Sequence, residues 1–84
     1  MVNNILLFQF ASQFAEASLT SLVESFNAQV GNHGFNSARA AYDYALINEL
    51  IRRGIDVSAI HDGKKTSFAH KVKLDIAANK LILA

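Results

Sequence analysis

The histidines are the first side chains to test for metal chemistry, because imidazole is a common metal ligand and the chain has no cysteine. They stand at three separated positions, His33, His61 and His70. No pair has the HxxxH or HExxH spacing that brings two imidazoles to one metal, and Asp62 beside His61 could join a site only across space. We expect loop positions for His33 and His61 and the apolar side of a strand for His70, with no metal bound.

Catalytic arrangements are equally scarce in this sequence. No serine stands in a G-x-S-x-G motif, and there is no thiol. The GNHG stretch at 31–34 is too short for a phosphate-binding loop and lacks its lysine, so it is more typical of a turn between helices. We therefore predict a non-catalytic protein, with no cofactor and no small-molecule substrate.

The segment HDGKKTSFAHKVKLD at 61–75 is the most basic part of the chain. Between residues 64 and 80, five lysines stand against the single acid Asp75, which gives a local charge of +4. Contacts to nucleic-acid phosphates are one interpretation, and the candidate residues are Lys64, Lys65, Lys71, Lys73 and Lys80. Solvation of an exposed strand is the other, because the whole chain carries only +1 and no aromatic side chain alternates with the lysines on their side.

Length and composition indicate one small globular domain over residues 1–84. Hydrophobic residues make up 51% of the 84 and charged residues 18%, proportions far from those of disordered chains. The absence of cysteine suits a reducing compartment. The apolar stretch Ile5–Phe10 has no Lys or Arg before it, unlike a signal peptide, and no apolar run approaches the ~20 residues of a membrane span. We expect a cytoplasmic protein without a membrane segment.

A first helix is predicted over residues 13–30. Its apolar residues recur at helical spacing, and Gly31 stands where a left-handed residue ends a helix. For residues 4–10 we favour a strand, with Ser12 as the N-cap of the helix. Continuing the helix backwards is the alternative, but a rod of about 40 Å would exceed the roughly 30 Å width of such a domain and would bear a second apolar face.

The second helix is predicted from an N-cap at Asn36 or Ser37 to Arg53, with Gly54 after its end. Two pairs four residues apart, Arg39 with Asp43 and Glu49 with Arg53, are expected on its surface. Its expected buried stripe consists of Ala40, Tyr44, Ile47 and Ile51, with Leu50 on the flank. A single helical turn capped by Asp56 is expected to follow.

Alternation of apolar and polar side chains predicts a half-buried strand over residues 68–76. A turn at 77–80 and a short strand over LILA complete an antiparallel hairpin. The predicted fold class is α+β, with the order β-α-α-β-β and two main helices packed on a small antiparallel sheet.

Protein–protein association is the function that these features favour. The N-terminal segment, with Leu7 and Phe10, carries more large apolar residues than one core needs, and a surplus apolar patch is typical of an interface. On the second helix, Tyr42 and Leu46 are expected on the side away from the buried stripe. Arg39 and Arg53 flank them, a composition typical of binding hot spots. We expect a protein partner, foremost a second copy in a dimer, although the sheet could cover these residues instead.

Overall fold

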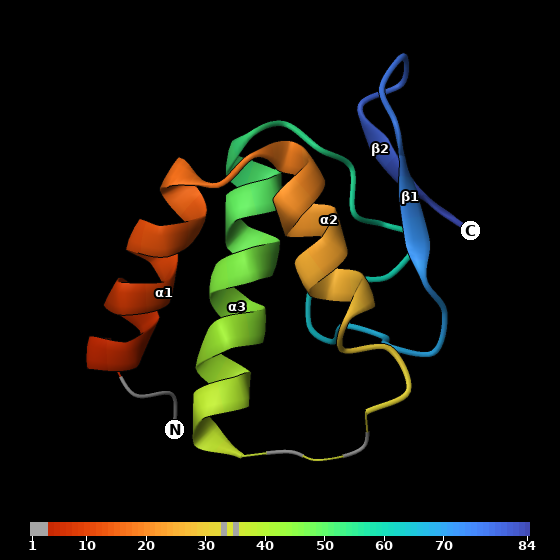
Figure 1. Cartoon of the computed structure of the whole chain (residues 1–84). Coiled ribbons are helices and arrows are strands. Elements are labelled where there is room, and N and C mark those ends of the chain that lie inside the picture. The colour runs from red at the N-terminus through yellow and green to blue at the C-terminus, as the bar shows by residue number, and fades with distance from the viewer. Residues whose placement is uncertain (1–3, 33, 35) are drawn as a thin grey trace.

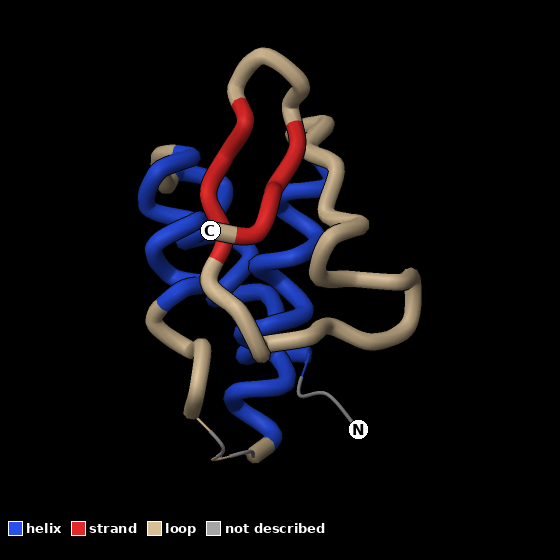
Figure 2. Tube along the Cα trace, turned by 90° about the vertical axis from the view of Figure 1, so that its right-hand side faces the viewer, coloured by secondary structure: helices blue, strands red, loops and turns tan. Residues whose placement is uncertain are grey.

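The computed structural model describes residues 4–32, 34 and 36–84, which form three helices followed by a β-hairpin (Figure 1). α1 and α3 run side by side in the same direction, and α2 runs back along α3. The hairpin lies across the far side of the helices from α1 (Figure 2). The elements in chain order are α1 (Asn4–Glu16), α2 (Leu19–Asn27), α3 (Ser37–Arg52), β1 (Val72–Asp75) and β2 (Lys80–Leu83). The predicted α+β class with an antiparallel sheet is confirmed.

The N-terminal segment is a helix, so the predicted strand over 4–10 is wrong. The predicted single helix over 13–30 is also wrong, because the chain breaks between Glu16 and Leu19. Ser18, rather than Ser12, is an N-cap, and its hydroxyl accepts a hydrogen bond from the Ser21 backbone N–H at 3.0 Å. The break resolves the length problem of a continuous rod, since α1 folds back against α3 and buries Phe14 there.

Arg53 holds the carboxyl end of α1 against the end of α3. Its Nη2 donates to the carbonyl oxygens of Phe14 at 2.8 Å and Ala17 at 2.7 Å. Its Nε donates to the Glu49 carboxylate at 2.6 Å. The last carbonyls of a helix lack their usual partners within that helix, and the guanidinium supplies a donor to this end of α1, where the Phe14 carbonyl also accepts from Ala17 N–H at 3.2 Å. The predicted Glu49–Arg53 pair is confirmed, but Glu49 is buried and does not lie on the surface.

Both ends of α3 follow the sequence-based expectation. The Asn36 side chain accepts a hydrogen bond from the Arg39 backbone N–H at 2.9 Å and caps the first turn. At the other end Gly54 has a φ of +80°, a left-handed conformation that favours glycine. Ile55 N–H bonds to the Leu50 carbonyl at 3.0 Å, and Gly54 N–H to the Ile51 carbonyl at 2.9 Å, which is the Schellman pattern.

The predicted buried stripe of α3 is largely wrong. Of its four members only Ile47 is buried, whereas Tyr44 and Ile51 are exposed and Ala40 is half-buried. The core side of α3 is the neighbouring arc, which consists of Ala41, Ala45, Leu46, Ile47, Glu49 and Leu50. The reason is that α1 and α2 both pack along α3 and leave Tyr44 and Ile51 outside.

The hairpin is shorter than predicted. β1 pairs with β2 in an antiparallel register from Val72 opposite Leu83 to Asp75 opposite Lys80. The predicted strand over 68–76 begins later, because the Phe68 carbonyl accepts a hydrogen bond from Gly31 N–H at 3.4 Å instead of pairing with a strand. His70, expected on the apolar side, is exposed, and so is Ile76 in the turn.

Two sets of hydrogen bonds attach the hairpin to the helices. The Asn27 side chain at the end of α2 donates to the Val72 carbonyl and accepts from the Val72 N–H, each at 2.8 Å. On the other strand, Leu81 N–H bonds to the Asp56 carbonyl at 2.9 Å. Asp56 also caps the predicted turn through the Ser58 N–H at 2.8 Å, which confirms that turn and its cap.

We expect Asn27→Ala to lower the free energy of unfolding by about 2 kcal/mol, because it leaves both backbone groups of the buried Val72 without partners. Urea unfolding followed by circular dichroism measures this change. Gln13→Ala, on the exposed side of α1, is the control and should shift the value by less than about 0.5 kcal/mol. Equal effects of the two substitutions would show that Asn27 does not hold the hairpin.

The surroundings of Glu49 predict that the free energy of unfolding depends on pH. Hydrogen bonds from Arg52 and Arg53 lower the pKa of Glu49, although burial opposes this. A carboxyl whose pKa is lower in the folded state contributes stability above its unfolded pKa of about 4.3, and this contribution is lost as pH falls through the lowered folded pKa.

Glu49→Gln should therefore lower the free energy of unfolding at pH 7 by about 2 kcal/mol, because charge-assisted hydrogen bonds are lost. Its stability should also fall less steeply than that of the wild type between pH 5 and acid unfolding. Urea unfolding at a series of pH values checks both effects. Glu24→Gln, an exposed carboxyl of α2, is the matched control, and identical pH profiles for the three proteins would contradict the role of Glu49.

Candidate functional site

The predicted exposure of Tyr42 and Leu46 is wrong. Leu46 is completely buried in the core. The Tyr42 ring is half-buried and makes edge-to-face contacts with Phe10 and Phe14 of α1, at centroid distances of 5.1 and 5.0 Å. Leu7 and Phe10 are half-buried and also pack against the core. α1, rather than the sheet, covers the side of α3 that the sequence suggested as an interface.

The two arginines expected to flank that interface are engaged within the chain. Arg53 bonds to α1 and to Glu49, as described above. Arg39 donates to the Asn32 carbonyl at 2.7 Å, to the Gly34 carbonyl and to the Gln29 side chain at 3.2 Å. Its guanidinium also lies 5.2 Å from the centre of the Phe68 ring. Both side chains therefore have a structural role in joining segments of the fold.

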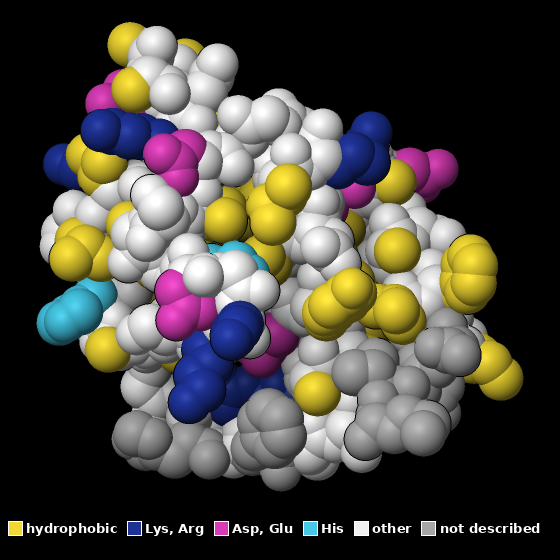
Figure 3. Space-filling view, turned by 180° about the vertical axis from the view of Figure 1, so that it is seen from behind, with side chains coloured by type: hydrophobic (Ala, Val, Ile, Leu, Met, Phe, Trp, Pro, Cys, Tyr) yellow, Lys and Arg dark blue, Asp and Glu magenta, His cyan; other side chains and the backbone are white. Residues whose placement is uncertain are grey.

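An uncovered apolar arc of α3 takes the place of the expected interface. We call Ala40, Tyr44, Ile47 and Ile51 the α3 stripe. Tyr44 is 56% exposed and Ile51 49% exposed, whereas Ile47 between them is buried and Ala40, one turn before Tyr44, is half-buried. On the neighbouring helix α1, Phe8 and Ile5 are 76% and 72% exposed. In Figure 3, hydrophobic side chains gather in the centre and over the right half of this side of the molecule.

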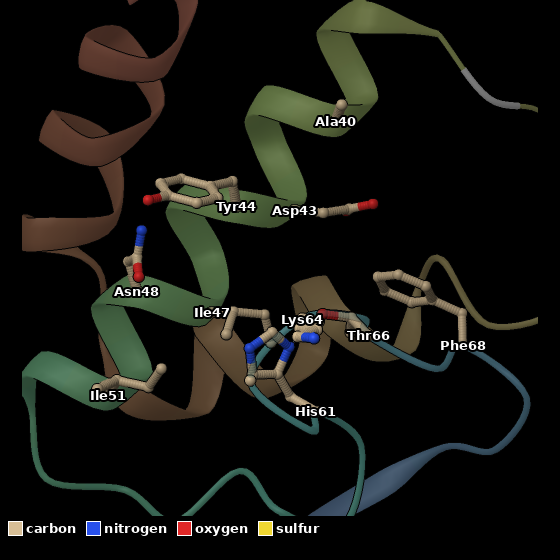
Figure 4. A pocket seen from close by; sticks show the side chains of 11 residues that line it. Ala40, Asp43, Tyr44, Ile47, Asn48, Ile51, His61, Lys64, Thr66 and Phe68 are labelled. Atoms are coloured by element: carbon tan, nitrogen blue, oxygen red, sulfur yellow. The ribbon is translucent and has the colours of Figure 1, made fainter. Parts of the chain in front are cut away.

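Two hollows flank the α3 stripe and share Tyr44 and Asn48. The larger, of 510 Å³, lies between α3 and the segment 61–68, and Figure 4 shows His61 beside Ile47 at its centre. The smaller, of 310 Å³, lies between α1 and α3 and is lined mainly by apolar side chains, among them Leu7 and Phe8. All four residues of the stripe line the larger hollow, with Ile47 buried at its floor, and Tyr44 also lines the smaller one.

Asp43 borders the larger hollow and pairs with Arg39, whose Nε lies 3.6 Å from Oδ2. This confirms the predicted pair, but the two side chains are only 15% and 14% exposed and do not lie on the surface as expected. The other carboxylate oxygen, Oδ1, is buried and has no hydrogen-bond partner within the described residues. Burial raises the pKa of Asp43, and the Gln29 side chain and the Arg39 charge offset part of the rise. Asp43 thus belongs to a partly buried network that joins α3 to the end of α2.

The five candidate lysines for nucleic-acid contact, Lys64, Lys65, Lys71, Lys73 and Lys80, are all exposed. Lys64 and Lys65 stand in the turn after Asp62, whose carboxylate accepts both of their backbone N–H groups. The other three lie on or beside the hairpin, where Lys80 is opposite Asp75. On the side shown in Figure 3, basic side chains form separate groups with acidic neighbours and no continuous basic surface.

The histidines differ in their surroundings. His61 is half-buried, and its Nδ1 lies 2.8 Å from the Thr66 hydroxyl. His33 lies outside the described residues. Across 4–32, 34 and 36–84, no group of three or more His, Cys, Asp or Glu side chains is placed to hold a metal ion. In the same part of the chain, every helix is too short or too polar to cross a membrane.

Comparison with protein-family models, with curated proteins and with solved structures gives no match to this chain.

The burial of Leu46 predicts that a substitution there acts on folding. Leu46→Ala should lower the free energy of unfolding by about 3 kcal/mol, because it removes apolar contacts and leaves a cavity. Ile76→Ala is the control, since Ile76 is 78% exposed, and should change stability by less than about 0.5 kcal/mol. Denaturant unfolding of both variants compares the two. A Leu46→Ala protein as stable as the wild type would contradict the burial of Leu46 in the core.

Proposed function

We propose that this protein works by stoichiometric protein–protein association, and that it associates with a second copy of itself. The observation that carries the proposal is a set of exposed large apolar side chains on neighbouring helices, Tyr44 and Ile51 of α3 and Phe8 and Ile5 of α1. Exposed apolar surface of this kind is typical of interaction sites.

The size of the chain supports self-association. A domain of 84 residues buries a smaller fraction of its surface than a larger one, and it has no disulfide to compensate. A standard interface takes about 800 Å² from each partner, roughly 15% of the 5469 Å² that this chain exposes.

The surroundings of the surface fit a protein partner. Of the charged residues near it, Arg39 pairs with Asp43 and Arg52 with Glu49, whereas Lys64, which lines the larger hollow, is exposed to solvent. Two copies can therefore approach without bringing unpaired buried charges together, which would oppose association. An apolar centre with a polar border is the usual composition of an interface.

Ile51→Ser should raise the dimer dissociation constant at least about tenfold, because it removes an exposed apolar side chain from the proposed contact. Sedimentation equilibrium over a range of protein concentrations measures the constant. Ile76→Ser is the matched control, since it removes an equally large and more exposed isoleucine from the hairpin turn. A wild-type chain that stays monomeric at high micromolar concentration, or equal effects of the two variants, would contradict the proposal.

A nucleic-acid interface on the lysines stays the alternative. Adding mixed DNA and RNA to the same sedimentation samples at low salt tests it. A monomer that shifts with nucleic acid, and that Lys71→Glu with Lys73→Glu abolishes, would favour the alternative.

A further inference from the structure

The residue spacing within the α3 stripe has a symmetry that bears on how two copies would meet. Its members are separated by four, three and four residues, so the spacing is the same when it is read in either direction. Two such helices packed antiparallel place residue 40 of one copy opposite residue 51 of the other, and residue 44 opposite residue 47. The stripe can therefore match itself across a two-fold axis, as the commonest homodimers do.

Recessed and protruding side chains alternate along the stripe, so reversing its direction pairs each protruding residue with a recessed one. Tyr44 and Ile51 protrude, whereas Ile47 is buried at the floor of the larger hollow and Ala40 is small and half-buried. In the antiparallel arrangement each protruding side chain meets a recessed one, Ile51 against Ala40 and Tyr44 against Ile47. In a parallel arrangement in register, Tyr44 would meet Tyr44 and Ile51 would meet Ile51, so protrusions would collide and hollows would stay empty.

We propose that a second copy of this chain docks with its α3 antiparallel to the first, with Ile51 of each copy seated over Ala40 of the other. This inference rests on the proposed self-association and adds its geometry. Interdigitation of protruding and recessed side chains is how packed helices reach the density of a protein interior.

The first experiment is site-specific crosslinking. Because the chain has no cysteine, Ala40→Cys and Ile51→Cys each introduce a single thiol. When an equimolar mixture is oxidised, we expect a mixed disulfide between the two variants and little product from either variant alone. Within an antiparallel pair, the two copies of residue 40 are about 16 Å apart along the helix axis, far beyond the reach of a disulfide.

Ile76→Cys is the crosslinking control, and it should give no product with either partner. Efficient crosslinking of Ala40→Cys with itself would show a parallel pair and overturn the inference. A dimer in sedimentation without a mixed disulfide would also overturn the geometry, although self-association would stand. A wild-type chain that sediments as a monomer would overturn both.

A volume exchange tests the same contact without a thiol. Ala40→Leu fills the recess that should receive Ile51 and should raise the dimer dissociation constant about tenfold. Ala40→Leu with Ile51→Ala exchanges the large and small members of the pair, so the constant should return to within a few-fold of the wild type. Residues 40 and 51 of one chain are three turns of helix apart, so rescue points to contact between copies. A double variant weaker than Ala40→Leu alone would contradict the antiparallel register.

Discussion

The hydrogen bonds of Arg53 decide how the rest of this small fold is arranged. One guanidinium, at the end of α3, satisfies carbonyl groups at the end of α1 and a buried carboxylate of its own helix. That contact fixes α1 along α3, and Phe10 and Phe14 of α1 then cover the Tyr42 ring. Because only one side of α3 can be covered in this way, the neighbouring arc with Tyr44 and Ile51 stays outside.

Local patterns were sufficient to predict the features that depend on few neighbours. The cap at Asn36, the left-handed Gly54 and the turn capped by Asp56 are hydrogen-bonding arrangements within five residues of the chain, and all three were predicted. The antiparallel hairpin was predicted from alternation alone, although its length was overestimated because Phe68 packs on Phe26 instead of extending a strand.

The misassigned features depend on contacts between distant parts of the sequence. The helical state of residues 4–16 rests on packing against α3, and its end at Glu16 is secured by Arg53, more than thirty residues later. Ser18 was the local signal for the break, but Ser12 offered a competing cap. On α3, two adjacent arcs are both apolar, and periodicity alone does not show which of them a neighbouring helix will cover.

The two buried or half-buried carboxylates of α3 respond to their surroundings in opposite directions. Two arginines bond to Glu49 and lower its pKa, so its ionised form stabilises the fold near neutral pH. Asp43 has one oxygen without a hydrogen-bond partner among the residues that the structure describes, and burial raises its pKa. Its contribution to stability therefore decreases as pH rises through its unfolded and then its folded pKa. Glu49 thus strengthens the contact that positions α1, whereas Asp43 borders the surface that α1 leaves open.

The most direct test of the central claim is an isotope-filtered NOE experiment on a mixture of labelled and unlabelled chains. Such spectra report only contacts between copies. We predict cross-peaks from the Tyr44 ring to the Ile47 methyl groups and from the Ala40 methyl to Ile51. Intermolecular cross-peaks confined to the hairpin, or none at millimolar concentration, would contradict association through the α3 stripe.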